Sequence, residues 1–465
     1  LQECLINAIE VSPHDKATAY IATTRYKFND HTPGLWKTTD YGKTWAKITN
    51  GLPENAFTRV VREDETRKDL LFAGTEIGLF ISFDGGKNWS PFQLNLPITP
   101  ITDLKIHKND LIAATSGRSF WILDDLNVLE QYKKDAPASA GASADRPAFS
   151  LIQPESAYLV NGGSPLNKTV EDFDGMGKTA GVNPANGIVL YYHLPKTETE
   201  ASKKPDEDLT LEIKDVAGNL VRTFSSKKDS LASEWEGGPS ETPTLSKKNG
   251  LNRFVWDMRY PTMSAVPGTY FENSFAGHKA APGRYSFTLK MGKQQVATTA
   301  EILSNPLYQT TAVDYAEYHR TMLDMEAKVT EMHDLINSLT AKREQLEQLL
   351  GSLPKDDAKY QTIQTEGKKL AENLKVWDEQ MVQRKSKAYD DVENFPNKFT
   401  ANYMFLLNQT ESDLPRVNQP SLDLKRDLDA EWVLLKARAN ELLEKDLPAL
   451  NRALWDVGVG GIWKR

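Results

Sequence analysis

The sequence predicts a multidomain protein in which two β-rich regions precede a helical region. Residues 34–45 recur as residues 78–89, and short alternating apolar runs dominate residues 1–132 and return from about residue 150 to 304. From about residue 306 onward, apolar residues follow helical spacing instead. At 465 residues the chain also exceeds a single domain of about 150 residues. We therefore expect three domains, at residues 1–160, 161–304 and 305–465.

Composition excludes several classes of function. The net charge of −8 argues against a nucleic-acid partner, which would require a basic face. The chain contains no apolar run of about 18 residues, so we expect no membrane span. Cys4 is the only cysteine, which excludes an internal disulfide and a multi-cysteine zinc site. The seven histidines form no pair with metal-ligand spacing, and we expect neither a metal nor a cofactor.

The recurring segment carries the pattern Ser/Thr-x-Asp-x-Gly-x-x-Trp. An Asp or hydroxyl side chain can accept hydrogen bonds from the backbone of a tight turn, and Gly supplies a positive φ. The Trp then covers the turn with a large apolar face. We expect a purely structural role for Thr38, Asp40, Gly42 and Trp45 in the first copy and for Ser82, Asp84, Gly86 and Trp89 in the second. A decayed third copy has strands at 101–106 and 111–114 and keeps only the acidic residue, Asp125.

This pattern resembles the Asp-box (BNR) repeat of sialidases, sortilin-like receptors and xyloglucan-degrading endoglucanases. The resemblance implies a partial β-propeller of about three blades, with residues 149–160 as a closing outer strand and residues 133–147 as a small-residue linker. Known propellers close with about four to eight blades. We therefore expect missing N-terminal blades from the same protein or from another chain. The later regions also resemble the carboxyl-terminal part of large glycosyl-hydrolase-like bacterial proteins, which implies a periplasmic, cell-surface or secreted location.

Candidate ligand-binding residues follow from the same resemblance. In sialidases the turns between the second and third strands of each blade point toward the ligand, and here these turns are residues 24–33, 75–77 and 115–118. The first turn is long for a hairpin loop, and long loops are often functional. These turns bring Arg25, Tyr26, Asp30, His31, Glu76 and Arg118 to one rim. Acids, arginines and an aromatic ring suit a glycan or a peptide, and Asp30 with Glu76 could form an acid/base pair.

The sequence leaves enzymatic activity undecided. Residues 57–62 lack the Arg-Ile-Pro motif of sialidases, and no xyloglucanase motif can be matched. We expect a binding protein for a glycan or peptide. One alternative is the non-catalytic tail of a glycoside hydrolase whose active site needs the missing blades. A further alternative is a scaffolding or assembly protein.

The second region predicts a small β-sandwich. Its strands are expected at residues 187–194, 209–216, 219–224, 250–256 and 283–290. The segments 211–224, 250–259 and 281–289 resemble immunoglobulin-like modules of bacterial surface proteins, which usually act as spacers. Trp256 and Tyr285 are expected in the core, Asp257 is expected to pair with Arg259, and residues 270–282 are expected to pack on the neighbouring propeller.

The third region predicts a helical hairpin or three-helix bundle. Its first helix has a stripe with alternating spacings of three and four, interrupted only by Arg343, and the helix is expected to end near Gly351 and Pro354. The second helix is expected at residues 356–385, and a third follows. The first stripe is Met322, Met325, Val329, Met332, Ile336, Leu339, Leu346 and Leu350, and the third-helix stripe is Leu424, Leu428, Trp432, Leu435, Ala439 and Leu442.

Overall fold

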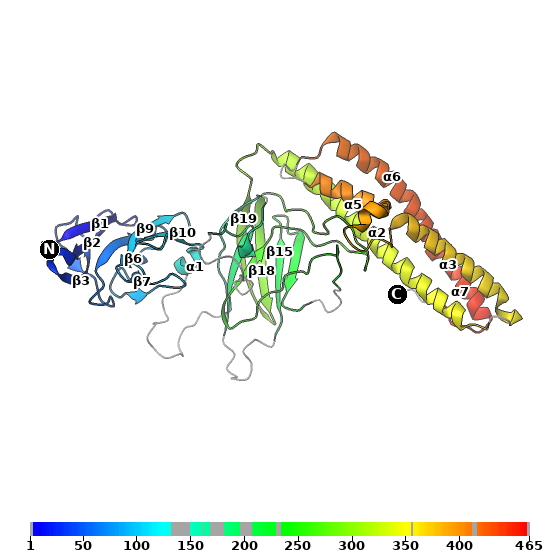
Figure 1. Cartoon of the computed structure of the whole chain (residues 1–465), viewed down its shortest axis with the longest axis horizontal. Coiled ribbons are helices and arrows are strands. Elements are labelled where there is room, and N and C mark those ends of the chain that lie inside the picture. Colours follow the sequence, from blue (N-terminus) through cyan, green and yellow to red (C-terminus); the bar gives the residue numbers. More distant parts are fainter. Residues whose placement is uncertain are drawn as a thin grey trace. The chain divides into compact units, whose positions relative to one another are not determined.

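The chain consists of β-sheets followed by a carboxyl-terminal helical region (Figure 1). A computed structural model describes residues 3–131, 149–160, 162–167, 181–195, 207–228, 234–354, 357–411 and 416–462. The predicted linker at 133–147 lies outside these ranges. The chain divides into two compact units, Leu1–Glu155 with Leu190–Lys196 and Asn249–Asn252, and Ser156–Val189 with Thr197–Lys248 and Arg253–Arg465.

The first unit begins with two four-stranded antiparallel sheets and a three-stranded one, as the alternating runs predict. The first sheet has the order β1 (Leu5–Val11), β2 (Ala19–Arg25), β3 (Asp30–Thr38) and β4 (Ala46–Lys47). The second has the order β5 (Thr58–Glu63), β6 (Leu71–Thr75), β7 (Gly78–Ser82) and β8 (Ser90–Pro91). The third consists of β9 (Ile101–His107), β10 (Asp110–Thr115) and β11 (Phe120–Leu123), and the helix α1 (Asn127–Glu130) follows it.

Consecutive sheets pack face to face through two apolar clusters. Tyr20, Ala22 and Leu35 of the first sheet meet Val61 and Phe80 of the second. The opposite face of the second sheet, which includes Phe72 and Leu79, packs on Ile101, Leu104 and Leu111 of the third. The alternation of side chains along each strand therefore serves two cores, one on either side of the middle sheet.

One prediction for the end of this region is wrong. Residues 149–160 do not add a closing strand to the three sheets. The short strand β12 (Ser150–Leu151) pairs with β14 (Ile188–Leu194), and β13 (Ala157–Tyr158) pairs in parallel with β19 (Gln294–Leu303). Four of these twelve residues are polar or charged, and they interrupt the apolar alternation. The sequence pattern therefore does not indicate which strand this segment pairs with.

The remaining strands form two sheets, in which β14 to β18 lie at the positions that the sequence predicts and β19 was not predicted. A five-stranded sheet has the order β13, β19, β18 (Gly283–Met291), β15 (Leu209–Lys214) and β16 (Leu220–Ser225). A three-stranded sheet has the order β12, β14 and β17 (Gly250–Trp256). Trp256 is fully buried against Tyr285 and Phe287, with ring centroids 5.4 and 5.8 Å apart, so its core position is confirmed.

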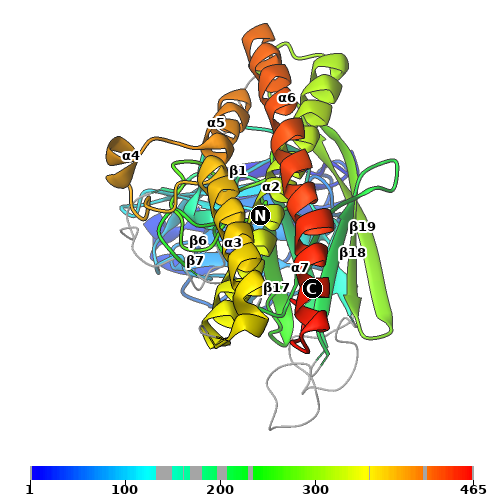
Figure 2. The same cartoon turned by 90° about the vertical axis from the view of Figure 1, so that its right-hand side faces the viewer.

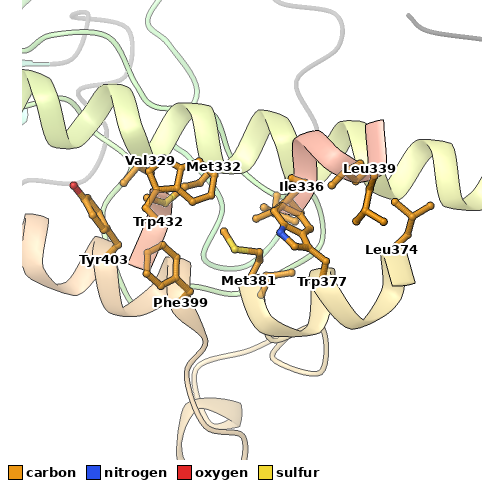
Figure 3. Packing of buried hydrophobic residues seen from close by; sticks show 14 of the residues in the cluster. Val329, Met332, Ile336, Leu339, Leu374, Trp377, Met381, Phe399, Tyr403 and Trp432 are labelled. Carbon is orange, nitrogen blue, oxygen red and sulfur yellow. The ribbon is translucent and has the colours of Figure 1, made fainter. Parts of the chain in front are cut away.

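The helical region is built on α2 (Ala312–Ser352), whose first turn is closed by a capping box between Thr311 and Asp314. Its predicted stripe, Met322 to Leu350, is buried. Figure 3 shows side chains of α3 (Gln361–Met381), α5 (Phe399–Thr410) and α6 (Gln419–Glu441) pointing toward that stripe. The second helix thus lies within the predicted range of 356–385.

A wide π-helical turn, Leu442–Asp446, carries α6 without a break into α7 (Leu447–Asp456). The wide turn keeps the buried side chains on one face, because one interval between them is five residues instead of three or four. These side chains are Ala439, Leu442, Leu447 and Leu450. Figure 2 shows α7 beside α3, against which it packs. A short helix, α4 (Asp391–Asn394), precedes α5.

Two further predictions for the second unit are wrong. Residues 270–282 pack on α2 rather than on a propeller, because Phe271 and Phe275 join the helical core. The Arg259 side chain pairs with Glu411 at 2.7 Å, and Asp257 pairs with Arg222 at 3.3 Å. The predicted Asp257–Arg259 pair survives only as a hydrogen bond from the Arg259 backbone N–H to the Asp257 carboxylate.

Candidate functional site

Aromatic rings gather at the connection between β2 and β3. Tyr26 stacks on Phe57 with ring centroids 5.5 Å apart, and the His31 ring lies 5.8 Å from the same Phe57 ring. Phe57, directly before β5, is 7 % exposed, whereas Tyr26 and Phe28 are 44 % and 52 % exposed. The second sheet therefore provides a buried base for aromatic side chains that the first sheet presents to solvent. We use the name rim cluster for eight residues of this region. They are Tyr26, Phe28, His31 and Phe57, together with Arg25, Asp30, Arg59 and Glu76.

Each arginine of the rim cluster contacts one carboxylate and one ring. Arg25 pairs with Asp30 at 3.0 Å, and its guanidinium lies 5.2 Å from the centroid of the Phe28 ring. Arg59 pairs with Glu76 at 2.6 Å and lies 5.2 Å from the Phe57 centroid. These contacts hold both guanidinium planes beside aromatic faces, where cation–π attraction adds to the ion pairs.

Local backbone geometry creates the loop. A 3-10 turn at Tyr26–Phe28 ends at Asn29, whose φ of 55° is left-handed and is tolerated by asparagine. The Asp30 carboxylate then accepts hydrogen bonds from the backbone N–H and the hydroxyl of Thr32, at 3.1 and 2.7 Å. The long turn expected at residues 24–33 is wrong, because β2 and β3 extend to a pair between Arg25 and Asp30 and leave only Tyr26–Asn29 as the connection.

The first two sheets are locked together just beneath the loop. The buried Thr58 hydroxyl donates to the backbone carbonyl of Gly34 at 2.9 Å and accepts from its N–H at 3.1 Å. A Cβ at Gly34 would lie 2.7 Å from the Thr23 carbonyl oxygen, so this crossing requires glycine. The relative position of Tyr26 and Phe57 follows from this contact.

Local hydrogen bonds keep one carboxyl group of the rim cluster, Asp30, ionised. The hydrogen bonds from Thr32, reinforced by Arg25, lower the pKa of Asp30 to about 2. Asp30 is therefore ionised at neutral pH and cannot donate a proton to a leaving group. Glu76, the second carboxylate considered for an acid/base pair, is held by Arg59.

Arg118 belongs to a different turn, between β10 and β11. Its backbone N–H donates to the Thr115 hydroxyl at 3.1 Å, and its carbonyl accepts from the Trp121 indole at 2.8 Å. Both hydrogen bonds of this exposed residue lie within its own turn. The structure therefore brings together Arg25, Tyr26, Asp30, His31 and Glu76 of the predicted rim residues, and leaves Arg118 apart.

The two repeated turns have the same hydrogen-bond pattern. In the first, Thr38 donates to Asp40 at 2.8 Å, and the Gly42 N–H donates to the Thr38 hydroxyl at 3.0 Å. In the second, Ser82 donates to Asp84 at 2.8 Å, and the Gly86 N–H donates to Ser82 at 3.0 Å. Both glycines have positive φ, 83° and 87°. Each Asp also accepts, at 2.9 Å, a backbone N–H four residues further on, from Thr44 or Asn88.

The outer face of the first sheet is an open apolar surface, distinct from the rim cluster. Ile9 pairs with Ile21, which pairs with Trp36, and the equivalent row of the second sheet is Val61, Ala73 and Phe80. The first sheet covers this second row, so that Val61 is 0 % exposed. Ile9 is 65 % exposed in comparison, and its neighbours Ile6 and Val11 are also exposed. Ile21 of the same row is 3 % exposed and Trp36 is half-buried, so the exposed part of this surface lies on β1. We call Ile6, Ile9 and Val11 the open face.

Sequence reasoning missed Phe28, Phe57 and Arg59 in the rim cluster. Phe57 and Arg59 belong to the start of the second sheet and reach the site only through contact between sheets. The spacing Phe-x-Arg beside a strand start is a weak signal. The pair Tyr26-x-Phe28 in a polar loop was the stronger signal, because exposed aromatic residues often mark binding surfaces.

No known protein-family profile and no curated protein matches the sequence. Several solved structures of the β-propeller type are similar in part. YCF48 bound to a D1 peptide shares 17 % identity over 26 % of this chain and 38 % of its own, with a TM-score of 0.21. An ancestral GH74 enzyme shares 14 % identity over 50 % of this chain and 39 % of its own, with a TM-score of 0.23.

A GH74 enzyme from Niastella koreensis shares 12 % identity over 63 % of this chain and 46 % of its own, with a TM-score of 0.22. The chain thus spans less than half the length of each of these proteins. Within the described ranges, no helix is long and apolar enough to cross a bilayer.

Proposed function

We propose that the first three sheets are blades of an Asp-box (BNR) β-propeller and that the rim cluster binds a glycan or an extended peptide. The observation that carries this proposal is the stack of exposed Tyr26 on buried Phe57, flanked by Arg25 and Arg59. A rigid aromatic face binds the apolar side of a sugar ring or of a peptide side chain at low entropic cost. Each guanidinium has five N–H donors, more than one carboxylate accepts, which leaves donors for ligand oxygens.

The test measures binding of two probes, a xyloglucan oligosaccharide and an extended peptide, by isothermal titration calorimetry. Tyr26→Ala should weaken binding of whichever probe binds by about tenfold, which corresponds to about 1.4 kcal/mol. Arg25→Ala and Glu76→Ala should also weaken it while leaving the melting temperature nearly unchanged. Tyr41→Ala is the matched control, because Tyr41 is an exposed tyrosine on a repeated turn. Normal binding by the Tyr26 and Arg25 variants would disprove the rim assignment.

The open face supports the proposal that further blades complete the ring. Its exposed residue Ile9 holds the position that Val61 holds in the second sheet, where a neighbouring sheet covers it. The covering blade comes from the same protein or from another chain. By the same family resemblance, we propose a periplasmic, cell-surface or secreted location.

The second candidate function is the non-catalytic part of a glycoside hydrolase. The ionised, arginine-paired state of Asp30 favours it, because hydrolysis would then need carboxylates from further blades. Release of reducing ends from xyloglucan by the chain joined to further blades would support this candidate. Saturable binding of a probe without turnover would support the binding function. If the chain shows neither binding nor turnover, the scaffolding role remains.

A further inference from the structure

Three of the seven histidines of the chain meet where one long connection packs on helix α2. This connection, residues 257–282 between β17 and β18, is called the connecting segment here. It folds back on itself, with hydrogen bonds from Tyr260 N–H to the His278 carbonyl at 3.0 Å and from Met263 N–H to the Phe275 carbonyl at 2.9 Å. His278 lies on the segment, and His319 and His333 lie on α2.

The first contact is a chain of four side chains. His278 is 0 % exposed, and its Nδ1 lies 2.9 Å from Glu326 Oε1. Its Nε2 lies 2.7 Å from His319 Nδ1, and His319 Nε2 lies 3.4 Å from the Tyr260 hydroxyl. One arrangement of protons satisfies every bond: Tyr260 donates to His319, His319 donates to His278, and His278 donates to a Glu326 oxygen.

This chain accepts one additional proton but not two. The additional proton can bind His319 Nε2, because the Tyr260 hydroxyl can turn to accept it and the Glu326 carboxylate lies at the other end of the chain. With two additional protons, His278 Nε2 and His319 Nδ1, which lie 2.7 Å apart, would both carry hydrogens directed at each other. The doubly protonated pair must therefore separate, and separation pulls the connecting segment from α2.

The second contact, at His333, has no room for any charge. His333 is fully buried, and its Nδ1 donates to the Ser264 carbonyl at 2.6 Å. The rings of Phe271 and Phe275 lie 5.4 and 5.9 Å away. No described residue forms a hydrogen bond with its buried Nε2, so a proton there would be neither solvated nor paired.

The surrounding charges do not offset this effect. Around the histidine pair lie Tyr260, Tyr318, Glu326, Tyr285 of β18 and Asp215 of the β15–β16 turn. Arg259 is paired with Glu411. The negative charge of Asp334 acts on His333 and opposes the lowering of its pKa. Burial dominates and lowers the pKa of His319, and it lowers the pKa of His333 to about 4.

We propose that the connecting segment is an acid-operated latch, closed on α2 at neutral pH by three histidines and opened by their protonation in mild acid. This device is independent of the ligand proposed for the rim cluster. Opening would uncover the face of α2 that carries His319, Glu326 and His333. The β-sheets of the second unit would then lose one of their attachments to its helices.

The test is hydrogen–deuterium exchange of the full chain at pH 7.5 and 5.0, corrected for the intrinsic rate. The amides of Tyr260 and Met263 should exchange faster at pH 5.0, by about 30-fold from His333 alone, since only the open state titrates near pH 6.5. Amides in the β18–β19 hairpin should keep their protection. Equal protection of the connecting segment at both pH values would overturn the proposal, whatever the variants do.

Two variants assign the response to the histidines. His319→Asn keeps a donor toward His278 but does not titrate, and His333→Phe fills the same apolar site. Each should move the opening to lower pH, whereas His107→Asn, an exposed histidine on β9, should leave it unchanged. An acid response that neither His319→Asn nor His333→Phe shifts would refute the latch.

Discussion

The indole of Trp89 donates to the Ile48 carbonyl at 2.8 Å, across the boundary between the first and second sheets. Trp45, at the same position of the first repeated turn, donates to the Gly42 carbonyl of its own turn at 3.1 Å. Equivalent tryptophans thus have different partners. Trp89 is 4 % exposed and belongs to the core between the sheets, because a preceding sheet covers it.

This difference predicts unequal effects of the same substitution. Trp89→Ala should lower the free energy of unfolding by about 3–5 kcal/mol, because it leaves a cavity between two sheets. Trp45→Ala should cost about 1 kcal/mol, since its partners are local and its ring is partly exposed. Urea denaturation of the two variants compares them directly. Equal losses of unfolding free energy in the two variants would contradict the conclusion that Trp89 stabilises the contact between the two sheets.

The repeated turn itself can be tested at Asp84. Asp84→Ala removes the acceptor for Ser82 and for the Asn88 N–H, and we expect a loss of about 1–3 kcal/mol. Asp84→Asn keeps one acceptor oxygen and should cost less. Thermal melting monitors both variants. An unchanged melting temperature for Asp84→Ala would remove this account of the turn.

Acid should weaken the first repeated turn. The hydrogen bonds from Thr44 and Thr38 lower the pKa of Asp40 to about 2, below the value of 3.8 that it has when unfolded. The stabilisation is therefore complete above pH 4 and is lost as the pH falls toward 2. Melting temperatures between pH 5 and pH 2 should fall less steeply for Asp40→Asn than for the wild type. Glu54→Gln, at an exposed glutamate, should follow the wild type.

We expect the chain to self-associate through the open face when no other sheet covers it. Ile9→Glu should reduce concentration-dependent self-association of the chain, because a charge on this face opposes burial. The fold should tolerate the change, since Ile9 is largely exposed. Sedimentation velocity measures the effect, with Val216→Glu in an exposed turn as the control. If both variants associate as the wild type does, the open face is not the contact.

Local features of this chain were predictable from sequence. The repeated turns depend on residues within eight positions of each other, such as Thr38 and Trp45, and the α2 stripe depends on one helical period. In each case the deciding contacts lie close in sequence, so periodicity and turn chemistry are sufficient.

Contacts between distant segments were not predictable. Phe57 reaches Tyr26 because the first two sheets pack together, through contacts such as Thr58–Gly34, and this packing leaves no trace in the spacing of either residue. The connecting segment has no regular period, and His278 is flanked by Gly277 and Lys279, which suggest an exposed turn. Its burial depends on a helix more than forty positions away, at His319 and Glu326.

The π-helical turn at Leu442–Asp446 has a consequence for how this part of the chain can vary in length. Its extra residue keeps Leu442 and Leu447 on one face although five positions separate them. Deleting one residue between them would give an ordinary α-helical interval of four and leave the face in phase. An insertion at the same place would rotate α7 by about 100° and turn Leu450 and Leu454 toward water. Natural variants should therefore shorten here more readily than they lengthen.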